Sequence, residues 1–507
     1  MPEDSVKKRY IYKLLTNLIG FSISLATAGM VPRALGVNKY GNFNFVNNIL
    51  TQFMTLLDMR TSTCFYTRLS QNNGDEKLVI FYGRLSFILI GILLLFTTCI
   101  AIITPLHDFL LPGQSILMIY CCLLYIVFTW LLEQMVRILD ARGLTVILEK
   151  HRMINKVGGC IVILILYGTN NLNLTTFFVF QYVTLGLLIF IFVVYLARKG
   201  YPIRLFSKLT KQEIKTTARR FYIYTSPLAF YVIIQFFVSI FDRWILQISG
   251  GSYEQGLYAF SFTFSNYCFI FVTALIPIFT RELSIAASKR EIPVMARLFR
   301  QYVPLLYAIT AYFCCFIFVQ ADEIVHIFGG AGYVDAVLSL KILAFYPLVS
   351  TYSNLNGSVI YANGKTKIFF KLSLVVAPLG IITAYWLIAK MNLGAAGLSL
   401  KNLGLEFVSV CTILWINAKY LELNFLKYLL HMVGSIIPFL ILGVIVKHAI
   451  NLFHFSTEAH VIITFFINGI FYSILVIIFI FFIPQLVGLS KNNLKYYVAK
   501  FSFIKNY

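Results

Sequence analysis

The amino-acid sequence predicts an all-α integral membrane protein with about 14 transmembrane helices. Hydrophobic residues make up 59% of the 507 positions and charged residues only 12%, which gives a mean hydropathy of +0.81. A soluble domain cannot bury so much apolar surface, whereas a bilayer accommodates about 20 apolar residues per spanning helix. A second observation supports this class: Lys and Arg lie almost entirely in alternate connecting loops.

The apolar residues gather into separate segments, each long enough to cross a bilayer as a helix. We expect spans at 11–32, 42–65, 79–104, 114–136, 154–171, 175–197, 221–241, 255–280, 301–320, 338–361, 368–389, 394–418, 427–449 and 460–484.

The distribution of the 42 basic residues predicts the orientation. Most of them precede the first span, follow the last span or lie in every second loop. The outer ends and loops carry only Arg33, Lys39, Arg243, Lys341, Lys390 and Lys447. Cytoplasmic loops of membrane proteins carry an excess of Lys and Arg, so we expect both termini in the cytoplasm. An even number of spans requires the same placement.

The most basic connection, 198–220, divides the spans into six and eight. We therefore expect an N-terminal lobe at 1–200, a basic cytoplasmic linker at 201–220, a C-terminal lobe at 221–418, and two final helices with a cytoplasmic tail at 419–507. A solvated linker explains this charge better than a lipid-regulated gate. The net charge of +22 does not indicate nucleic-acid binding, because it is spread over short loops beside helix ends.

Motifs for catalysis and for nucleotide binding are missing from the sequence. Gly364-Lys365-Thr366 resembles the end of a phosphate-binding loop, but Val359 occupies the position of the required glycine. The histidines and cysteines show no metal-binding spacing, and the outer loops are too short to hold an active site. We therefore expect neither an enzyme nor a metal site.

Four spans carry polar residues along one helical face. In the span 42–65 the face consists of Asn44, Asn48, Thr51, Thr55, Asp58 and Ser62. The other three faces are Asn17, Gly20, Ser24 and Thr27; Tyr231, Gln235, Ser239 and Asp242; and Thr351, Asn354, Ser358 and Tyr361. Such faces also mediate helix–helix packing. Because amides and carboxylates exceed what packing requires, we favour a water-filled cavity lined by the four spans.

Charged residues within spans are costly, so each is expected to have a partner or to face a cavity. Glu133 and Arg137 are four residues apart and can pair along one helix. Asp58 and Arg60 are only two residues apart, about 200° around a helix, so we expect them not to face one cavity. The same argument separates Lys401 from Glu406.

Two stretches of the sequence resemble one another and indicate repeated halves. Arg33 is followed by Gly41-Asn42-Phe43-Asn44-Phe45, and Arg243 by Gly256-Leu257-Tyr258-Ala259-Phe260. In each, Arg and a short outer turn precede a Gly-x-aromatic-x-Phe pattern that opens the next helix. Both stretches enter from the same side, so the two halves form a parallel repeat, with substrate expected between them.

These residues resemble the polysaccharide-export flippases of the MOP superfamily, also called Wzx or O-antigen flippases. The resemblance rests on Val31-Pro32-Arg33-Ala34-Leu35-Gly36 with Tyr40-Gly41, Asp242-Arg243-Trp244-Ile245-Leu246 with Gly256-Leu257-Tyr258, Phe328-Gly329-Gly330 with Tyr333, Leu343-Ala344-Phe345, and Tyr361-Ala362-Asn363-Gly364-Lys365-Thr366.

The resemblance implies two pseudo-symmetric six-helix lobes, with two additional C-terminal helices in this chain. It also implies translocation of undecaprenyl-pyrophosphate-linked oligosaccharide, a surface-polysaccharide repeat such as O-antigen, from the cytoplasmic to the periplasmic leaflet of the cell inner membrane by alternating access. No cofactor is implied, and a proton or sodium gradient is a candidate energy source. The expected partners are the lipid-linked substrate and membrane lipids, with other polysaccharide-assembly proteins as candidates.

A pyrophosphate requires Arg or Lys, and sugars require amides, hydroxyls and aromatic rings. The candidate substrate-binding residues are therefore Arg33, Asn44, Asn48, Thr51, Asp58, Arg60, Gln235, Asp242, Arg243, Asn354 and Lys401. Two alternatives remain: a multidrug or small-molecule antiporter of the same superfamily, and a membrane-embedded polysaccharide polymerase or ligase. The antiporter favours a carboxylate-rich cavity, and the polymerase or ligase requires a sizeable outer loop.

Overall fold

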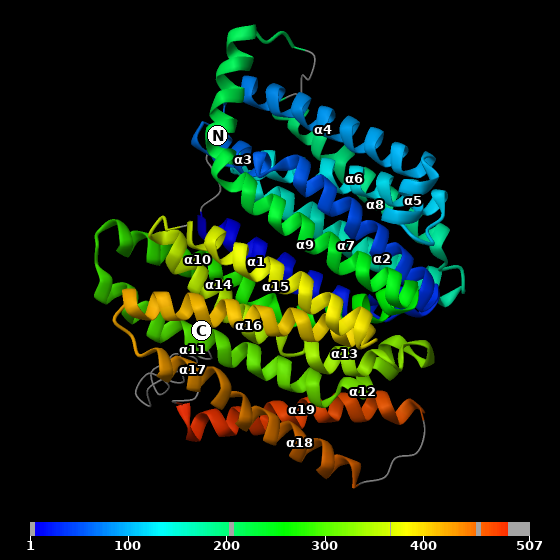
Figure 1. The fold of residues 1–507 in the computed structure, drawn as a ribbon, viewed down its shortest axis with the longest axis vertical. Coiled ribbons are helices and arrows are strands. Elements are labelled where there is room, and N and C mark those ends of the chain that lie inside the picture. The colour runs from blue at the N-terminus through cyan, green and yellow to red at the C-terminus, as the bar shows by residue number, and fades with distance from the viewer. Residues whose placement is uncertain (1–5, 73, 202–206, 366, 453–457, 485–507) are drawn as a thin grey trace. The chain divides into compact units, whose positions relative to one another are not determined.

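A computed structural model describes residues 6–72, 74–201, 207–365, 367–452 and 458–484. Within these ranges the chain is helical and contains no β-strand, which confirms the predicted fold class (Figure 1). The helices form two compact units. The first unit comprises residues 1–256 and 373–394, and the second comprises 257–372 and 395–507. The predicted C-terminal tail from residue 485, and residues 202–206 of the predicted linker, lie outside the described part.

The first unit begins with α1 (Val6–Thr27), α2 (Met30–Asp58) and α3 (Thr61–Gln71). It continues with α4 (Glu76–Ile102), α5 (Thr104–Leu110), α6 (Ile116–Ala141), α7 (Thr145–Gly168), α8 (Leu174–Arg198) and most of α9 (Lys211–Asn266). Most of α15 (Lys367–Ala384) and the π-helical turn η4 (Tyr385–Lys390) also belong to this unit. Helix α1 packs on α7, and α6 packs on α2 and α8.

The second unit contains η1 (Tyr267–Phe269), α10 (Ile270–Ser288), α11 (Ile292–Val319), α12 (Ala321–Ile324), η2 (Val325–Gly329), η3 (Ala331–Tyr333), α13 (Ala336–Leu343) and α14 (Tyr346–Ala362). It ends with α16 (Gly394–Tyr420), α17 (Phe425–Gly434), α18 (Ile436–Asn451) and α19 (Glu458–Phe482). Helix α11 packs on α10, α14 and α18, and α18 packs on α19.

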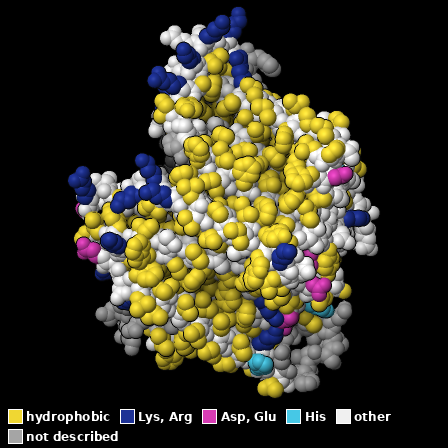
Figure 2. Space-filling view, viewed as in Figure 1, with side chains coloured by type: hydrophobic (Ala, Val, Ile, Leu, Met, Phe, Trp, Pro, Cys, Tyr) yellow, Lys and Arg dark blue, Asp and Glu magenta, His cyan; other side chains and the backbone are white. Residues whose placement is uncertain are grey.

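Each of the predicted apolar segments lies mainly on helical residues, but fewer helices qualify as membrane spans. Ten described helices are long and apolar enough to cross a bilayer, or eleven if the bent pair formed by α1 and α2 counts as one span. The predicted total of 14 is therefore not confirmed. Figure 2 shows that the visible face is largely hydrophobic, as expected of a surface that contacts lipid. Phe230 and Phe481, for example, are 67% and 62% exposed.

Two long helices are interrupted by glycines with positive φ. Helix α2 departs from helical geometry at Gly36 (φ 74°, ψ 161°), and α9 does so at Gly251 (φ 65°, ψ −163°). Residues with a Cβ rarely adopt this conformation, so glycine permits both breaks. The sequence predicts a short turn between separate spans in each place. The structure instead has two helical segments joined directly at one glycine.

One end of the first unit has a hydrophobic core built from α3, α4, α6, α7, α8 and α9. Buried members of this core include Phe65, Tyr82, Leu139 and Phe192. The rings of Phe65 and Tyr82 stack with their centroids 4.2 Å apart and their planes at 12°. This core fixes α3 against α4, and thereby holds the polar residues at the junction of α2 and α3.

Candidate functional site

The first unit contains a half-open cavity of about 370 Å³ between α2, α3 and α6. Its polar lining includes Asn47, Thr51, Asp58 and Arg60 from the α2–α3 region, and Glu133 and Arg137 from α6. Trp130 and Tyr125 contribute aromatic rings. The cavity thus combines charged groups, amides, hydroxyls and aromatic side chains within one helical bundle.

Asp58 and Arg60 face the same cavity, contrary to the sequence prediction. The prediction assumed one continuous helix, but α2 ends at Asp58. Met59 and Arg60 adopt left-handed conformations, with φ of 43° and 65°. Helix α3 begins at Thr61. The angular separation expected on a helix therefore does not apply across this junction.

The carboxylate of Asp58 is buried and well satisfied by hydrogen bonds. It accepts hydrogen bonds from the Thr61 hydroxyl at 2.7 Å, from the Ser62 hydroxyl at 2.7 Å and from the Ser62 backbone amide at 2.9 Å. The Tyr82 hydroxyl lies 3.5 Å from one of its oxygens. These contacts satisfy donors in the first turn of α3, so Asp58 holds the helical junction in place.

The charges of the cavity leave one basic group without a carboxylate partner. Glu133 and Arg137 pair at 3.6 Å along α6, as the spacing predicts. Asp58 is occupied by hydroxyl and amide donors. Among the described residues no carboxylate forms an ion pair with Arg60, whose side chain is exposed to the cavity. An anionic group entering the cavity could therefore pair with this guanidinium.

Two other lining residues carry buried polar atoms without protein partners. The side-chain oxygen of Asn47 and the indole N–H of Trp130 have no hydrogen-bond partner among the described residues. A buried polar atom that lacks a partner is costly, so water or a bound hydroxyl group is expected to satisfy both atoms. An acceptor and a donor in one cavity match the hydroxyl groups of a sugar.

Of the candidate residues from the sequence, the structure brings Thr51, Asp58 and Arg60 together in this cavity. On the same helix, Asn44 donates to the Tyr40 carbonyl at 2.8 Å, and the side-chain oxygen of Asn48 is buried without a partner.

The remaining candidates lie elsewhere. Arg33 is exposed on α2, Gln235 is exposed on α9, and Asp242 is half-buried on α9. Asn354 is exposed and donates to the Ser350 carbonyl at 2.8 Å in the second unit. Lys401, which is 4% exposed, is also in the second unit.

Arg243 belongs to a second polar cluster, where α9 passes α2 in the first unit. Its guanidinium donates to the Gln255 side-chain oxygen at 3.2 Å, and the Gln255 amide donates to the Arg243 carbonyl at 2.5 Å. Nearby, the Ser252 hydroxyl and the Gln114 amide both donate to the side-chain oxygen of Asn42. Arg243 is therefore held in one orientation by Gln255.

The sequence reasoning missed Asn47 and the contribution of α6 to the cavity. Asn47 lies one residue before Asn48 and falls off the expected polar face, because the cavity wraps around α2 toward α6. The sequence feature that indicates a role for α6 is the presence of two charged residues, Glu133 and Arg137, within an otherwise apolar span. A pair that neutralises itself along one helix does not require a cavity, so the spacing alone does not predict that α6 lines one.

No family model and no curated protein sequence matches the chain. Solved structures match it in fold. The lipid II flippase MurJ, in an inward closed conformation, aligns with 93% of this chain and 98% of its own, with a TM-score of 0.59 and 16% identity. An inward-facing multidrug resistance MATE family transporter of the MOP superfamily aligns with 81% of this chain and 95% of its own, with a TM-score of 0.55 and 13% identity.

A mutant of the Vibrio cholerae MATE transporter VcmN gives a TM-score of 0.53 over 82% of this chain and 95% of its own, with 16% identity. At these identities the likeness establishes the fold. The chain is a multi-pass membrane protein with the fold of the MOP-type transporters.

Proposed function

We propose that this protein is a flippase, which moves undecaprenyl-pyrophosphate-linked oligosaccharide units from the cytoplasmic to the periplasmic leaflet of the cell inner membrane by alternating access. In this proposal both termini are cytoplasmic, because most of the basic residues then lie on the inner side. The transport step makes and breaks no covalent bond. A proton or sodium gradient is the proposed energy source.

The observation that carries the proposal is Arg60 in the polar cavity of the first unit. Its guanidinium can bind two oxygens of a pyrophosphate at once. Asn47, Thr51 and Trp130 line the same cavity and offer hydrogen bonds and a stacking surface for sugars. The fold likeness to a protein described as a lipid II flippase supports a lipid-linked substrate.

A multidrug or small-molecule antiporter is the second candidate function. The cavity also contains Asp58 and Glu133, and two of the similar structures are described as multidrug resistance transporters. Both carboxylates are already engaged, Asp58 by hydroxyl and amide donors and Glu133 by Arg137. A cationic substrate would have to displace these partners, whereas an anionic substrate finds Arg60 without one. The charge balance of the cavity therefore favours the flippase.

The proposal can be tested with the purified full-length protein in liposomes. A fluorescent undecaprenyl-pyrophosphate oligosaccharide is placed in one leaflet, and a membrane-impermeant glycosidase reports its arrival in the other. The wild type should accelerate translocation. Arg60→Gln should slow it about tenfold, the loss expected for one strong charge-assisted contact.

Lys39→Gln provides the matched control for charge, because Lys39 is exposed on α2 and does not line the cavity. It should leave translocation unchanged. Absence of any acceleration by the wild type, together with proton-coupled uptake of a cationic dye by the same liposomes, would establish the antiporter instead.

A further inference from the structure

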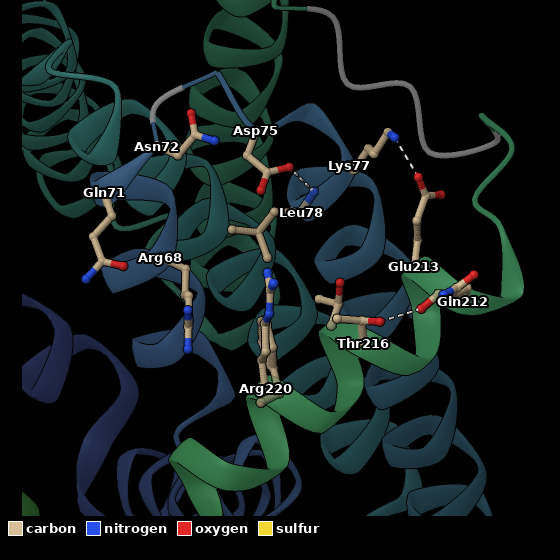
Figure 3. Close-up of a pocket in the computed structure, with 12 residues that line it drawn as sticks. Arg68, Gln71, Asn72, Asp75, Lys77, Leu78, Gln212, Glu213, Thr216 and Arg220 are labelled. Atoms are coloured by element: carbon tan, nitrogen blue, oxygen red, sulfur yellow. Dashed lines mark hydrogen bonds and ion pairs between the residues drawn. The ribbon is translucent and has the colours of Figure 1, made fainter.

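A second pocket, of about 400 Å³, lies at one end of the first unit and is separate from the candidate transport cavity. It is formed where the end of α3 and the turn before α4 meet the first turns of α9 (Figure 3). Its lining includes Arg68, Gln71, Asn72, Gln212, Thr216 and Arg220. Figure 3 shows the side chains of Arg68 and Arg220 extending into the space between α3 and α9.

The carboxylates of this pocket are already engaged by other groups. Asp75 accepts a hydrogen bond from the backbone amide of Leu78 at 2.9 Å and so caps α4. Glu213 pairs with Lys77 at 2.5 Å and accepts a hydrogen bond from the backbone amide of Thr210 at 2.9 Å. These contacts fix the ends of α4 and α9 in position. Because of these contacts, neither carboxylate is paired with an arginine of the pocket.

Arg68 and Arg220 therefore provide a net positive charge that no carboxylate within the described chain neutralises by an ion pair. They come from different helices, and their guanidinium groups can approach one anion from two sides. The side-chain amides of Gln71, Asn72 and Gln212 supply further donors. Several donors with two guanidinium groups are the chemistry that binds a phosphate.

The position of the pocket relative to the spans favours a lipid phosphate over a soluble one. Helix α4, which is a candidate membrane span, begins at Glu76, and the part of α9 that is a candidate span includes Ala229, nine residues after Arg220. The pocket therefore lies at the depth of lipid headgroups. Two and three residues after Arg220, Tyr222 is 71% exposed and Ile223 is 61% exposed. These side chains offer an apolar surface for an acyl chain, which a soluble phosphate does not need.

We propose that this pocket binds the phosphate group of an anionic phospholipid in the leaflet that faces the basic loops. The lipid is a bound component of the protein and differs from the transported molecule proposed above. It joins α3 to α9 through Arg68 and Arg220, alongside the ion pair between Lys77 and Glu213. The inference depends on the pocket alone and holds for either transported substrate.

The test uses native mass spectrometry of the purified full-length protein in a neutral detergent, titrated with phosphatidylglycerol or with phosphatidylcholine. The wild type should bind a first phosphatidylglycerol molecule about tenfold more tightly than phosphatidylcholine. The double variant Arg68→Gln, Arg220→Gln should lose this preference. Arg68→Lys, Arg220→Lys should recover only part of it, because Lys keeps the charge but lacks the planar fork of Arg.

The control is Lys215→Gln, Arg219→Gln, which removes the same charge from exposed positions of α9 that do not line the pocket. It should keep the preference for phosphatidylglycerol. An equal loss in this control would mean a diffuse electrostatic effect and would overturn the proposal.

Sodium phosphate, compared with sodium chloride at equal ionic strength, distinguishes the source of the phosphate. Displacement of the lipid by phosphate alone would overturn the assignment to a lipid headgroup. Thermal unfolding of each variant confirms that it is folded.

Discussion

Gly41 of α2 and Gly256 of α9 lie in direct backbone contact. A methyl group built at Gly41 would come within 2.8 Å of the Gly256 nitrogen and would collide with the Ser252 carbonyl oxygen. A methyl group at Gly256 would collide with the carbonyl oxygen of Val37. Each glycine follows a positive-φ glycine by five residues, Gly36 in one case and Gly251 in the other. The two similar stretches of sequence therefore meet at a glycine from each. The hydrogen bonds that Ser252 and Gln114 donate to Asn42 lie beside this contact.

The close approach predicts that Gly41→Ala separates α2 from α9. Because the added methyl group meets backbone atoms, which cannot rotate away, the substitution should destabilise the protein by about 1–3 kcal/mol. Thermal unfolding in detergent measures the effect. Gly91→Ala is the matched control, since a methyl group at this exposed position of α4 meets nothing within 4 Å. An unfolding temperature for Gly41→Ala that equals that of the control would show that the contact is loose.

The junction at Asp58 gives a second prediction. Asp58→Ala removes the acceptor for the Thr61 and Ser62 hydroxyls and for the Ser62 amide. It should lower the stability of the protein by about 0.5–2 kcal/mol, the usual effect of losing a helix cap. The loss should be larger if no water replaces the carboxylate as a partner of the buried hydroxyls. Asp58→Asn keeps one oxygen as an acceptor and should cost less. Thr55→Ala is the control, because its exposed hydroxyl bonds only to its own helix. Unfolding by denaturant or by heat should show the largest loss of stability for Asp58→Ala, a smaller loss for Asp58→Asn and the smallest for Thr55→Ala.

The helical fold could be predicted from sequence because apolar composition and segment length depend on the bilayer rather than on tertiary contacts. The junction at Asp58 could not be predicted in the same way. Nothing in the residues around Met59 and Arg60 marks a helix break, since neither is a glycine or a proline. The left-handed turn is stabilised by the contacts of Asp58 with α3 and Tyr82, which depend on the packed core. Long-range packing therefore decided which charges share the cavity.

The sequence indicates where the two glycine breaks lie, but not that they are kinks within a helix. Gly36 and Gly251 lie just ahead of the repeated Gly-x-aromatic-x-Phe pattern. A turn between two spans and a kink at one glycine give the same pattern of residues, so the pattern alone does not separate them. What distinguishes them is the contact between Gly41 and Gly256, which requires segments more than two hundred residues apart to meet.

The shape of the cavity predicts which positions of α2 are accessible to water. Single cysteines at Thr51 and Thr55, which line the cavity, should react with a water-soluble thiol reagent. Cysteines at Ile49 and Leu50, which are 2% and 0% exposed, should stay protected. The measurement compares labelling rates in a background in which the accessible native cysteines have been replaced. Equal rates at all four positions would indicate that α2 is mobile and that the cavity is not defined.

The ion pair between Lys77 and Glu213 predicts how pH affects the first turn of α9. The Lys77 ammonium and the donors of Thr210 lower the pKa of Glu213 from 4.5 to about 2. Because this pKa is depressed in the folded state, the contact is fully present above pH 4.5 and is lost as the pH falls toward 2. Amide hydrogen exchange of residues 214–217 should therefore be slower in the wild type than in Glu213→Gln at pH 5–8, and the two should converge near pH 2. The comparison at each pH cancels the intrinsic dependence of exchange on pH. Added salt should reduce the difference, since the pair is partly exposed to solvent. A difference in exchange between the wild type and Glu213→Gln that persists unchanged at pH 2 would show that the Glu213 side chain stabilises this turn independently of its charge.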